Sequence, residues 1–192
     1  MKTPAGVVLA AGAGRRFGKP KALVEHRGRL LVDRAAEVLA DAGCDPVVVV
    51  LGAAADEVRQ RAELRGVTTV VNPDWPTGMG SSLRTALDAL RGSEAPAALV
   101  LPVDMPGIGP EAVRRVAELT APDVLAAAAH GGRRSHPVLL GREHWSGAAA
   151  SATGDAGARE YLKQRTVTMV SCDDVSDGFD VDRPEDLDRL GT

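Results

Sequence analysis

The sequence contains few aromatic residues, few cysteines and no long apolar run. Phe, Trp and Tyr make up only 3% of the 192 residues, so we expect a core built from the plentiful Ala, Val and Leu. The two cysteines, Cys44 and Cys172, lack metal-ligand spacing, and we expect buried or half-buried free thiols. No apolar run is long enough to span a bilayer and no signal-peptide core is present, so we expect a cytoplasmic protein.

The charge of the chain is nearly balanced, with 23 basic and 26 acidic side chains and a formal net charge of −3. This balance argues against nucleic acid or a membrane surface as a partner. Basic side chains gather instead at residues 15–21, so basicity is a property of one local site. A chain of 192 residues suits one α/β domain with a sizeable core, and we treat residues 1–192 as a single domain.

Short apolar runs alternate with segments of helical spacing. The runs predict strands at residues 7–11, 46–52, 67–71, 97–106, 123–129 and 166–171, and a further strand after the turn at 131–132. Helices are predicted at residues 30–42, 54–64, 81–90 and 110–119. Two more are predicted, one that ends at about residue 163 and one that begins at residue 184. This alternation is typical of a mainly parallel sheet covered by helices on both faces, with ligands at the carboxyl ends of the strands.

The first predicted strand runs into a glycine-rich, basic loop at residues 12–21. Glycine allows positive φ and close approach of a ligand to the main chain, and consecutive amide N–H groups form an anion-binding concavity. Four cations, too many for a plain turn, lie in the loop: Arg15, Arg16, Lys19 and Lys21. We therefore predict a triphosphate site, since the glycines and the preceding strand argue against a merely flexible, solvated loop.

Two common phosphate-binding loops do not fit this stretch. The Walker P-loop requires a Gly-Lys-Ser/Thr ending, whereas Ala13 and the proline after the lysine break its pattern. The dinucleotide fingerprint G-x-G-x-x-G fails by one residue, because Gly12 and Gly14 are followed by Gly18. Pro20 would also break the helix that this fingerprint requires.

Residues 9–21 resemble the signature L-A-A-G-x-G-x-R-M-G-x-x-K of nucleotidyltransferases that attach a nucleoside monophosphate to a phosphorylated acceptor. Phe17 replaces the usual methionine with another apolar side chain. The likeness is nearest to the molybdenum-cofactor cytidylyltransferase branch. It implies a three-layer, Rossmann-like nucleotidyltransferase fold (the nucleotide-diphospho-sugar transferase fold), with nucleotide bound by the N-terminal part and acceptor by the C-terminal part. The nucleotide-binding residues implied in this loop are Leu9, Ala10, Ala11, Gly12, Ala13, Gly14, Arg15, Arg16 and Lys21.

A second glycine-rich element follows the third strand. Two prolines and two glycines in residues 72–80 exclude regular structure as far as Gly80, and we expect Ser81 or Ser82 to cap the next helix. A helix N-terminus offers oriented N–H groups to a phosphate. The stretch resembles the family's G-x-G-x-S-L element, which implies that Gly80, Ser81 and Ser82 contact the nucleotide base and ribose.

Acidic residues in mid-chain and near the C-terminus are the candidate metal ligands. Asp104 ends an apolar strand, where a carboxylate is unfavourable unless it is paired, caps a turn or binds metal. Mg²⁺ prefers one or two carboxylates with phosphate oxygens and water. The triplet 104–106 resembles the family's D-M-P, whose aspartate holds magnesium. The ending at residues 180–187 resembles D-x-D-x-P-E-D-L, and Asp182 is the preferred second ligand, with Asp180 as the alternative.

Two later segments resemble those that border the acceptor in this family. His136 lies in a match to G-x-x-x-H-P-V-L; it could act as a base, but a positioning or packing role is favoured. Asp155 and Arg159 lie in a match to G-D-x-G-A-R. The planar guanidinium of Arg159 suits an acceptor phosphate, although a helix-face cation would look the same in sequence.

Together the motifs imply transfer of CMP from CTP to the terminal phosphate of molybdopterin, with Mg²⁺ as cofactor. Arg16, Lys21 and Asp104 are the expected catalytic residues. The resemblance favours CTP over GTP, because family members with Leu-Ala-Ala-Gly, as at residues 9–12, tend to take CTP and those with Leu-Ala-Gly-Gly tend to take GTP. The methyl group of Ala11 in place of glycine is compatible with the smaller pyrimidine. A molybdoenzyme or its chaperone is a further partner that the resemblance implies. The alternatives are a guanylyltransferase, a cytidylyltransferase for methylerythritol phosphate or a sugar phosphate, and a non-catalytic nucleotide- or cofactor-binding protein.

Overall fold

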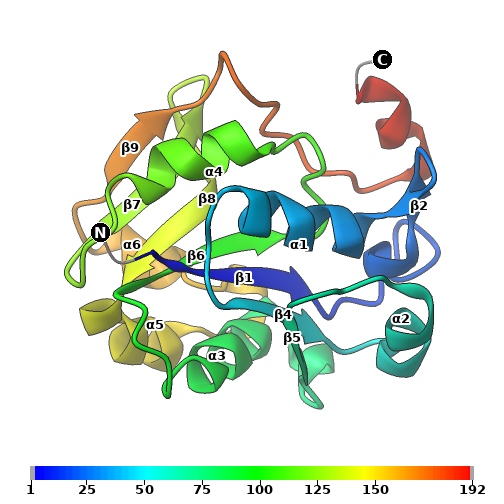
Figure 1. Cartoon of the computed structure of the whole chain (residues 1–192), viewed down its shortest axis with the longest axis horizontal. Coiled ribbons are helices and arrows are strands. Elements are labelled where there is room, and N and C mark those ends of the chain that lie inside the picture. The colour runs from blue at the N-terminus through cyan, green and yellow to red at the C-terminus, as the bar shows by residue number, and fades with distance from the viewer. Residues whose placement is uncertain (1–2, 191–192) are drawn as a thin grey trace.

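The computed structural model describes residues 3–190 and contains a central seven-stranded sheet (Figure 1). The order of its strands is β5-β4-β1-β6-β8-β7-β9. The strands are β1 (Ala5–Ala10), β4 (Val47–Leu51), β5 (Thr68–Val71), β6 (Ala97–Pro102), β7 (Leu125–His130), β8 (Arg133–Gly141) and β9 (Thr168–Ser171). A short hairpin of β2 (Glu25–His26) and β3 (Arg29–Leu30) lies outside this sheet.

The sheet is mainly parallel, as the alternating sequence pattern predicts. Strand β1 pairs in parallel with β4 and β6, β4 pairs in parallel with β5, and β7 pairs in parallel with β9. Strand β8 is the exception, because it pairs antiparallel with both β6 and β7. The turn between β7 and β8 uses Gly131 and Gly132, whose φ values of 56° and 74° lie in the region that favours glycine.

Helices cover both faces of the sheet, which gives the three layers expected (Figure 1). Helices α1 (Leu31–Asp41) and α4 (Pro110–Ala117) pack on one face, and α2 (Ala55–Arg61) contributes Val58 to the same core. Helices α3 (Met79–Ala89), α5 (Trp145–Ser151) and α6 (Arg159–Lys163) pack on the other face. Among residues 3–190, no helix combines the length and apolar character needed to cross a bilayer.

Five short 3₁₀ helices connect these elements. They are η1 (Lys21–Leu23), η2 (Trp75–Thr77), η3 (Arg142–His144), η4 (Gly154–Ala156) and η5 (Pro184–Arg189). Three of them, η1, η2 and η4, follow or flank loops that belong to the candidate site described below. Short 3₁₀ helices therefore fix the backbone beside the loops of the candidate site.

The core is aliphatic, and β1 shows how it is divided between the two faces. Val8 and Ala10 belong to the cluster under α1 and α4, whereas Val7 and Leu9 belong to the cluster under α3 and α5. Successive side chains of a strand point to opposite faces, so one buried strand serves both cores. Both cysteines are buried free thiols, as expected, and burial raises the pKa of Cys44 to about 12.

Two local predictions were wrong. Helix α3 begins at Met79 with Gly78 at its N-cap, so neither Ser81 nor Ser82 caps it, and η2 places regular structure where none was expected. Gly78 has a φ of 112°, which lets the chain turn sharply into the helix before the serines.

We expect Gly80→Ala to destabilise the fold. A Cβ at position 80 would lie 2.7 Å from the carbonyl carbon of Ala152 and 2.8 Å from the amide nitrogen of Thr153. Both are backbone atoms and cannot rotate away, so overpacking should lower the free energy of unfolding by about 1–3 kcal/mol. Urea denaturation measures the change. Gly92→Ala is the matched control, since its Cβ would meet no atom within 4 Å. Equal stabilities of the two variants would contradict this packing argument.

Candidate active site

The loop at residues 12–21 folds back on itself after the carboxyl end of β1. Phe17 and Gly18 both donate backbone hydrogen bonds to the carbonyl oxygen of Gly14, at 3.0 and 2.8 Å. Gly14 has a φ of 61°, and a Cβ there would collide with the carbonyl group of Lys19. Glycine is therefore required at position 14, and the folded loop delivers Lys21 to the start of η1.

A cavity of about 310 Å³ lies beside this loop. The loop forms one side of the cavity, and η2, α3 and η4 form the opposite side. Segments that are distant in the sequence therefore meet there. The cavity is lined by Leu9, Ala11, Gly12, Ala13, Arg15, Trp75, Pro76, Gly78, Met79, Ser82 and Asp155. Six of these were predicted to bind nucleotide, and Asp155 was predicted to border the acceptor. We call this space the smaller cavity.

Ala10, Gly80 and Ser81 were also predicted to bind nucleotide, but they do not line the smaller cavity. The side chain of Ala10 faces the core under α1 and α4, so only its backbone is available to a ligand. Gly80 packs against the backbone of residues 152–153. Ser81 is buried, where it accepts a hydrogen bond from Asn72 at 2.8 Å, and Asn72 also bonds Ser82 at 3.0 Å. Asn72 thereby holds the first turn of α3 against the loop after β5.

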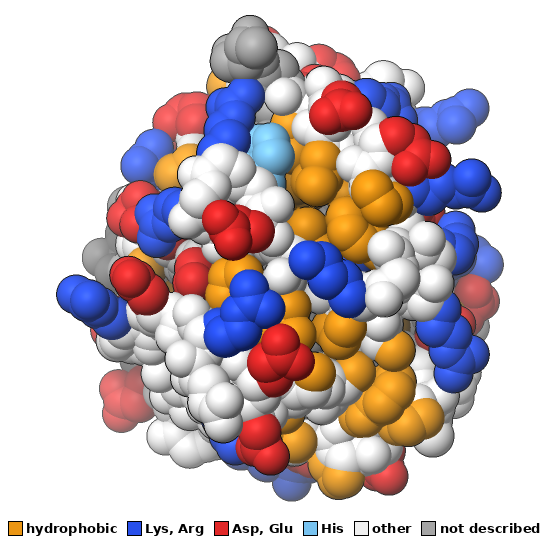
Figure 2. All heavy atoms as spheres, turned by 90° about the vertical axis from the view of Figure 1, so that its right-hand side faces the viewer, with side chains coloured by type: hydrophobic (Ala, Val, Ile, Leu, Met, Phe, Trp, Pro, Cys, Tyr) orange, Lys and Arg blue, Asp and Glu red, His pale blue; other side chains and the backbone are white. Residues whose placement is uncertain are grey.

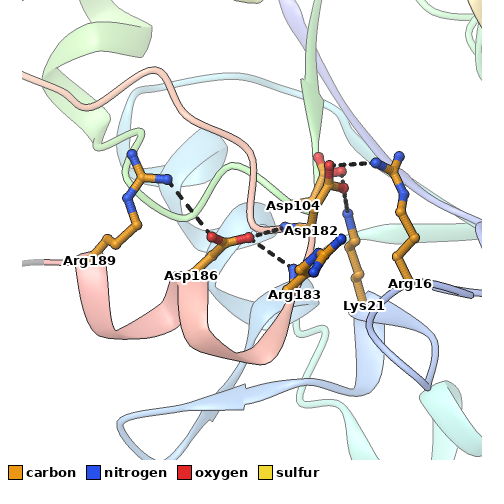
Figure 3. Close-up of polar contacts among 7 residues, drawn as sticks. All are labelled: Arg16, Lys21, Asp104, Asp182, Arg183, Asp186 and Arg189. Carbon is orange, nitrogen blue, oxygen red and sulfur yellow. Dashed lines mark hydrogen bonds and ion pairs between the residues drawn. The ribbon is translucent and has the colours of Figure 1, made fainter.

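Lys21 lies between two carboxylates from distant parts of the chain (Figure 3). Its Nζ donates to Asp104 Oδ2 at 2.9 Å and to Asp182 Oδ1 at 2.8 Å. The Lys21 side chain is 14% exposed, whereas Arg16, which pairs with Asp182 Oδ2 at 3.0 Å, is 73% exposed. The Lys21 contacts are thus shielded from water and the Arg16 contact is largely screened. We call the three residues Lys21, Asp104 and Asp182 the Lys21 bridge.

The charges of the bridge shift the pKa values of its members and of a neighbour. Burial works to lower the pKa of Lys21, but the two carboxylates outweigh it and the pKa rises above its ordinary value. The hydrogen bond from Lys21 lowers the pKa of Asp182. Asp180 behaves oppositely, because burial and then the like charges of Asp104 and Asp182 raise the pKa of its carboxyl group.

Backbone contacts fix the positions of the two carboxylates. Asp104 lies two residues beyond the end of β6, and its carbonyl oxygen accepts the N–H of Val181 at 2.8 Å. The carboxylate of Asp186, in η5, accepts the backbone N–H groups of Asp182 and Arg183 at 3.0 and 2.9 Å (Figure 3). Asp186 therefore positions Asp182. In sequence it is visible only as an acidic residue at a helix start.

The bridge suits a divalent cation chemically. Asp104 and Asp182 each place a carboxylate oxygen within hydrogen-bond distance of Lys21 Nζ, so two hard oxygen ligands converge on one point. Residues 3–190 contain no cluster of three or more His, Cys, Asp or Glu side chains arranged to hold a metal ion. The protein would therefore supply the carboxylates of Asp104 and Asp182 as ligands. Phosphate oxygens and water would complete the coordination, which is the arrangement that Mg²⁺ prefers.

A second, larger cavity of about 490 Å³ adjoins the first and shares Leu9, Met79 and Asp155 with it. It contains all three residues predicted to border the acceptor, His136, Asp155 and Arg159. Its further charged lining residues are Asp104, Asp180, Arg134 and Lys163, and its apolar lining residues include Leu83, Val100, Pro102, Val138, Leu140 and Leu162. Figure 2 faces the carboxyl end of β1 and shows apolar side chains exposed between basic and acidic ones.

Arg134 and Lys163 are site residues that the sequence reasoning missed. Arg134 lies just before His136 on β8, and Lys163 lies one helical turn after Arg159 on α6. Helical residues four apart share a face, so the spacing of Arg159 and Lys163 was an available signal. The cavity thus gathers three basic side chains beside a wall that is in part aliphatic.

The fold is that of a nucleotidyltransferase. The sequence model of the MobA-like NTP transferase domain matches residues 6–169, and the chain belongs to this family. The chain is 42% identical over 195 residues to the nicotine blue oxidoreductase of Paenarthrobacter nicotinovorans, covering 96% of this chain and 95% of that protein. It is 30% identical to the molybdenum cofactor guanylyltransferase of Shewanella halifaxensis, covering 96% and 92%.

Solved structures agree with this assignment. The structure of Rv0371c from Mycobacterium tuberculosis superimposes with a TM-score of 0.85 at 28% identity, covering 98% of this chain and 97% of that one. A manganese complex of the same protein superimposes with a TM-score of 0.80, covering the same shares. The family resemblance predicted from the motifs and the Rossmann-like nucleotidyltransferase fold are therefore confirmed. A divalent metal is bound by at least one structural relative.

We expect His136 to stay neutral well below neutral pH. Burial lowers the pKa of its imidazole from 6.5 to about 4, against the smaller opposing attraction of Asp104. Between these values the unfolded chain binds the proton and the folded chain does not, so this group makes stability fall as pH drops from 6.5 towards 4. Titration of the ring resonance by NMR, assigned with His136→Gln, measures the pKa. A midpoint near 6.5 would contradict the expected lowering of this pKa.

Proposed function

We propose that this protein transfers CMP from CTP to the terminal phosphate of a pterin acceptor, molybdopterin in the first instance. The observation that carries the proposal is that Asp104 of the Lys21 bridge lines the larger cavity, which shares Leu9, Met79 and Asp155 with the smaller cavity beside the loop. Such an arrangement presents a nucleotide and an acceptor to the same charged residues. It is also consistent with the molybdenum cofactor guanylyltransferase named above.

In this reaction the loop at residues 12–21 binds the triphosphate. The amides of Ala13 and Gly14 donate to phosphate oxygens, and Arg16 and Lys21 balance the negative charge that develops on the departing pyrophosphate. An oxygen of the acceptor phosphate forms a bond to the α-phosphorus, and the bond from that phosphorus to the bridging α,β oxygen breaks. Because the acceptor phosphate is already ionised at neutral pH, the protein needs no nucleophile of its own.

Asp104 and Asp182 are the side chains that would hold Mg²⁺, with Asp180 as the alternative second ligand. When bound there, the ion supplies positive charge to the phosphate oxygens. Asp186 keeps the backbone of Asp182 in place, and the tail hydrogen bond from Val181 to Asp104 ties the two ligands together. The carboxylates that face Lys21 in the free protein are thus preorganised for a cation.

The larger cavity supports an anionic acceptor with an apolar body. Arg134, Arg159 and Lys163 provide positive charge, and Arg159 is the proposed partner of the acceptor phosphate. The aliphatic part of the wall suits the face of a flat ring system such as a pterin, and the polar lining residues suit its hydrogen-bonding edge. His136 and Asp155 line the same cavity and complete the proposed acceptor site.

A second candidate function is favoured by one observation, the 42% identity to a nicotine blue oxidoreductase over nearly the whole of both chains. In this case the larger cavity would hold a planar organic pigment, and the smaller cavity a reduced dinucleotide as electron donor. A non-catalytic binding protein is the less favoured alternative, because the loop cations and both candidate metal carboxylates are present.

The two candidate functions are distinguished by one set of assays on the purified full chain. We expect pyrophosphate release with CTP, Mg²⁺ and molybdopterin, and no release without acceptor. In parallel, nicotine blue and a reduced nicotinamide dinucleotide are followed by absorbance. Bleaching of the pigment without any pyrophosphate release from CTP or GTP would replace the first function with the second.

We expect Asp104→Asn to abolish most of the pyrophosphate release while the protein stays folded. The substitution keeps the shape of the side chain but removes the charge that faces Lys21 and the proposed ion, so kcat should fall by about 100-fold or more. Asp88→Asn is the matched control, since Asp88 is a surface residue paired only with Arg91 among the described contacts. A rate near that of the wild type in Asp104→Asn, with Mg²⁺ present, would remove Asp104 from the reaction.

We expect CTP to be used in preference to GTP. Ala11 is buried and lines the smaller cavity, and its methyl group narrows the space that a purine would need. Ala11→Gly should shift the ratio of kcat/KM for CTP over GTP towards GTP by about tenfold, the scale of one methyl group in a tight pocket. Ala13→Gly removes a methyl group from the same cavity wall and serves as the control. Equal use of CTP and GTP by the wild type would overturn the CTP assignment.

A further inference from the structure

Lys21 occupies the two carboxylate oxygens that would bind a metal ion. Asp104 Oδ2 and Asp182 Oδ1, which converge on its Nζ at 2.9 and 2.8 Å, are each engaged by this ammonium group. A divalent cation that used both oxygens would have to take the place of Nζ. The lysine and the ion therefore compete for one location in the protein.

The backbone of Lys21 cannot leave this location, so competition falls on its side chain alone. Ala22 and Leu23, the next residues of η1, are buried, and Gly14 packs against the backbone of residues 19–21. The ammonium group of Lys21 is carried on a flexible four-carbon stem, so it can turn to a new anionic partner. Phosphates bound by the loop at residues 12–21 would provide that partner.

We infer that Lys21 is an internal counter-ion that holds the metal-binding carboxylates until a triphosphate draws it away. This inference rests on the proposed function for the identity of the site. It explains why two carboxylates can lie close together in the free protein without mutual repulsion, since the ammonium group balances them. It also makes the metal and the triphosphate cooperative ligands, because each relieves the competition that opposes the other, and such coupling is reciprocal.

Arg16 does not perform the same task. It pairs with the other oxygen of Asp182 and is 73% exposed, so its charge is shared with solvent and it can move away freely. Lys19 lies in the same loop and is exposed, with no ion pair to either carboxylate among the described contacts. Lys21 is paired with both carboxylates and Lys19 with neither, and this is the difference that the inference requires. Lys19 is therefore a matched control.

The test measures Mn²⁺ binding to the full chain, without nucleotide, by the loss of the free-ion signal in electron paramagnetic resonance. We expect Lys21→Met to bind Mn²⁺ roughly tenfold more tightly than the wild type, a typical size for a coupling between two ligands. Lys19→Met removes the same charge from the same loop and should stay within about twofold, as exposed charges contribute little. Lys21→Arg retains the charge and should bind Mn²⁺ as weakly as the wild type.

A second measurement repeats the titrations with tripolyphosphate, which carries the charge of the nucleotide but no base. The increase in Mn²⁺ affinity on adding it should be larger for the wild type than for Lys21→Met, while the affinity of the ion for free tripolyphosphate is common to both. Thermal unfolding verifies that each variant is folded; if Lys21→Met is not, Lys21→Gln replaces it.

Each outcome bears on the inference. Equal Mn²⁺ affinities of Lys21→Met, Lys19→Met and the wild type would overturn it and leave the proposed function standing. Absence of Mn²⁺ binding to every variant, with and without tripolyphosphate, would overturn both the inference and the metal assignment. Tighter binding by Lys21→Met alone, in a protein that releases no pyrophosphate from any nucleotide, would support the inference and reject the proposed reaction.

Discussion

The contact on which the site depends is the ammonium group of Lys21, held between the carboxylates of Asp104 and Asp182. It joins residues that are 83 and 161 positions apart in the sequence. Strands β1 and β6 are neighbours in the sheet and both run in the same direction, so the loops that follow them meet at one edge. The tail reaches that edge because Val181 bonds to Asp104 and Asp186 bonds to the backbone at Asp182.

The surroundings of this contact explain how a small domain gathers several charges without losing stability. Each carboxylate of the bridge has a cationic partner, and the partly buried Lys21 has two anionic ones. Such a cluster is favourable when complete and unfavourable when one member is missing. On the inference made above, the same balance would let the cluster change partners: Lys21 would turn to bound phosphate while Asp104 and Asp182 bind a cation.

The architecture could be predicted from sequence because its signals are local. Apolar runs and helical spacing give the strand and helix order, and the glycines and cations at residues 12–21 give the phosphate loop. The boundary at Ser81 and Ser82 could not, since Gly78 and the distant Asn72 decide where α3 starts. The two-glycine turn indicates a strand that returns beside β7, but the pairing of β8 with β6, which is distant in sequence, has no local signal.

The site shows the same division. Lys21, Asp104 and Asp182 could be selected from their motifs, but the ion pairs among them arise only when three segments meet. Arg134 and Lys163 have no motif of their own and join the site through the orientation of β8 and α6. Asp186 looks like an ordinary acidic helix start in sequence, and its task of holding Asp182 depends on the path of the tail.

We propose that a divalent ion held by Asp104 and Asp182 contacts the phosphates of a nucleotide bound by the loop after β1. The most direct test is electron–nuclear double resonance of Mn²⁺ bound to the protein with a non-hydrolysable CTP analogue. With the aspartate carboxylates labelled with carbon-13, we expect both phosphorus-31 and carbon-13 couplings to the ion, and loss of a carbon-13 coupling in Asp104→Asn. Unchanged couplings in Asp104→Asn, or protein-bound Mn²⁺ without any phosphorus coupling in the wild type, would contradict the account.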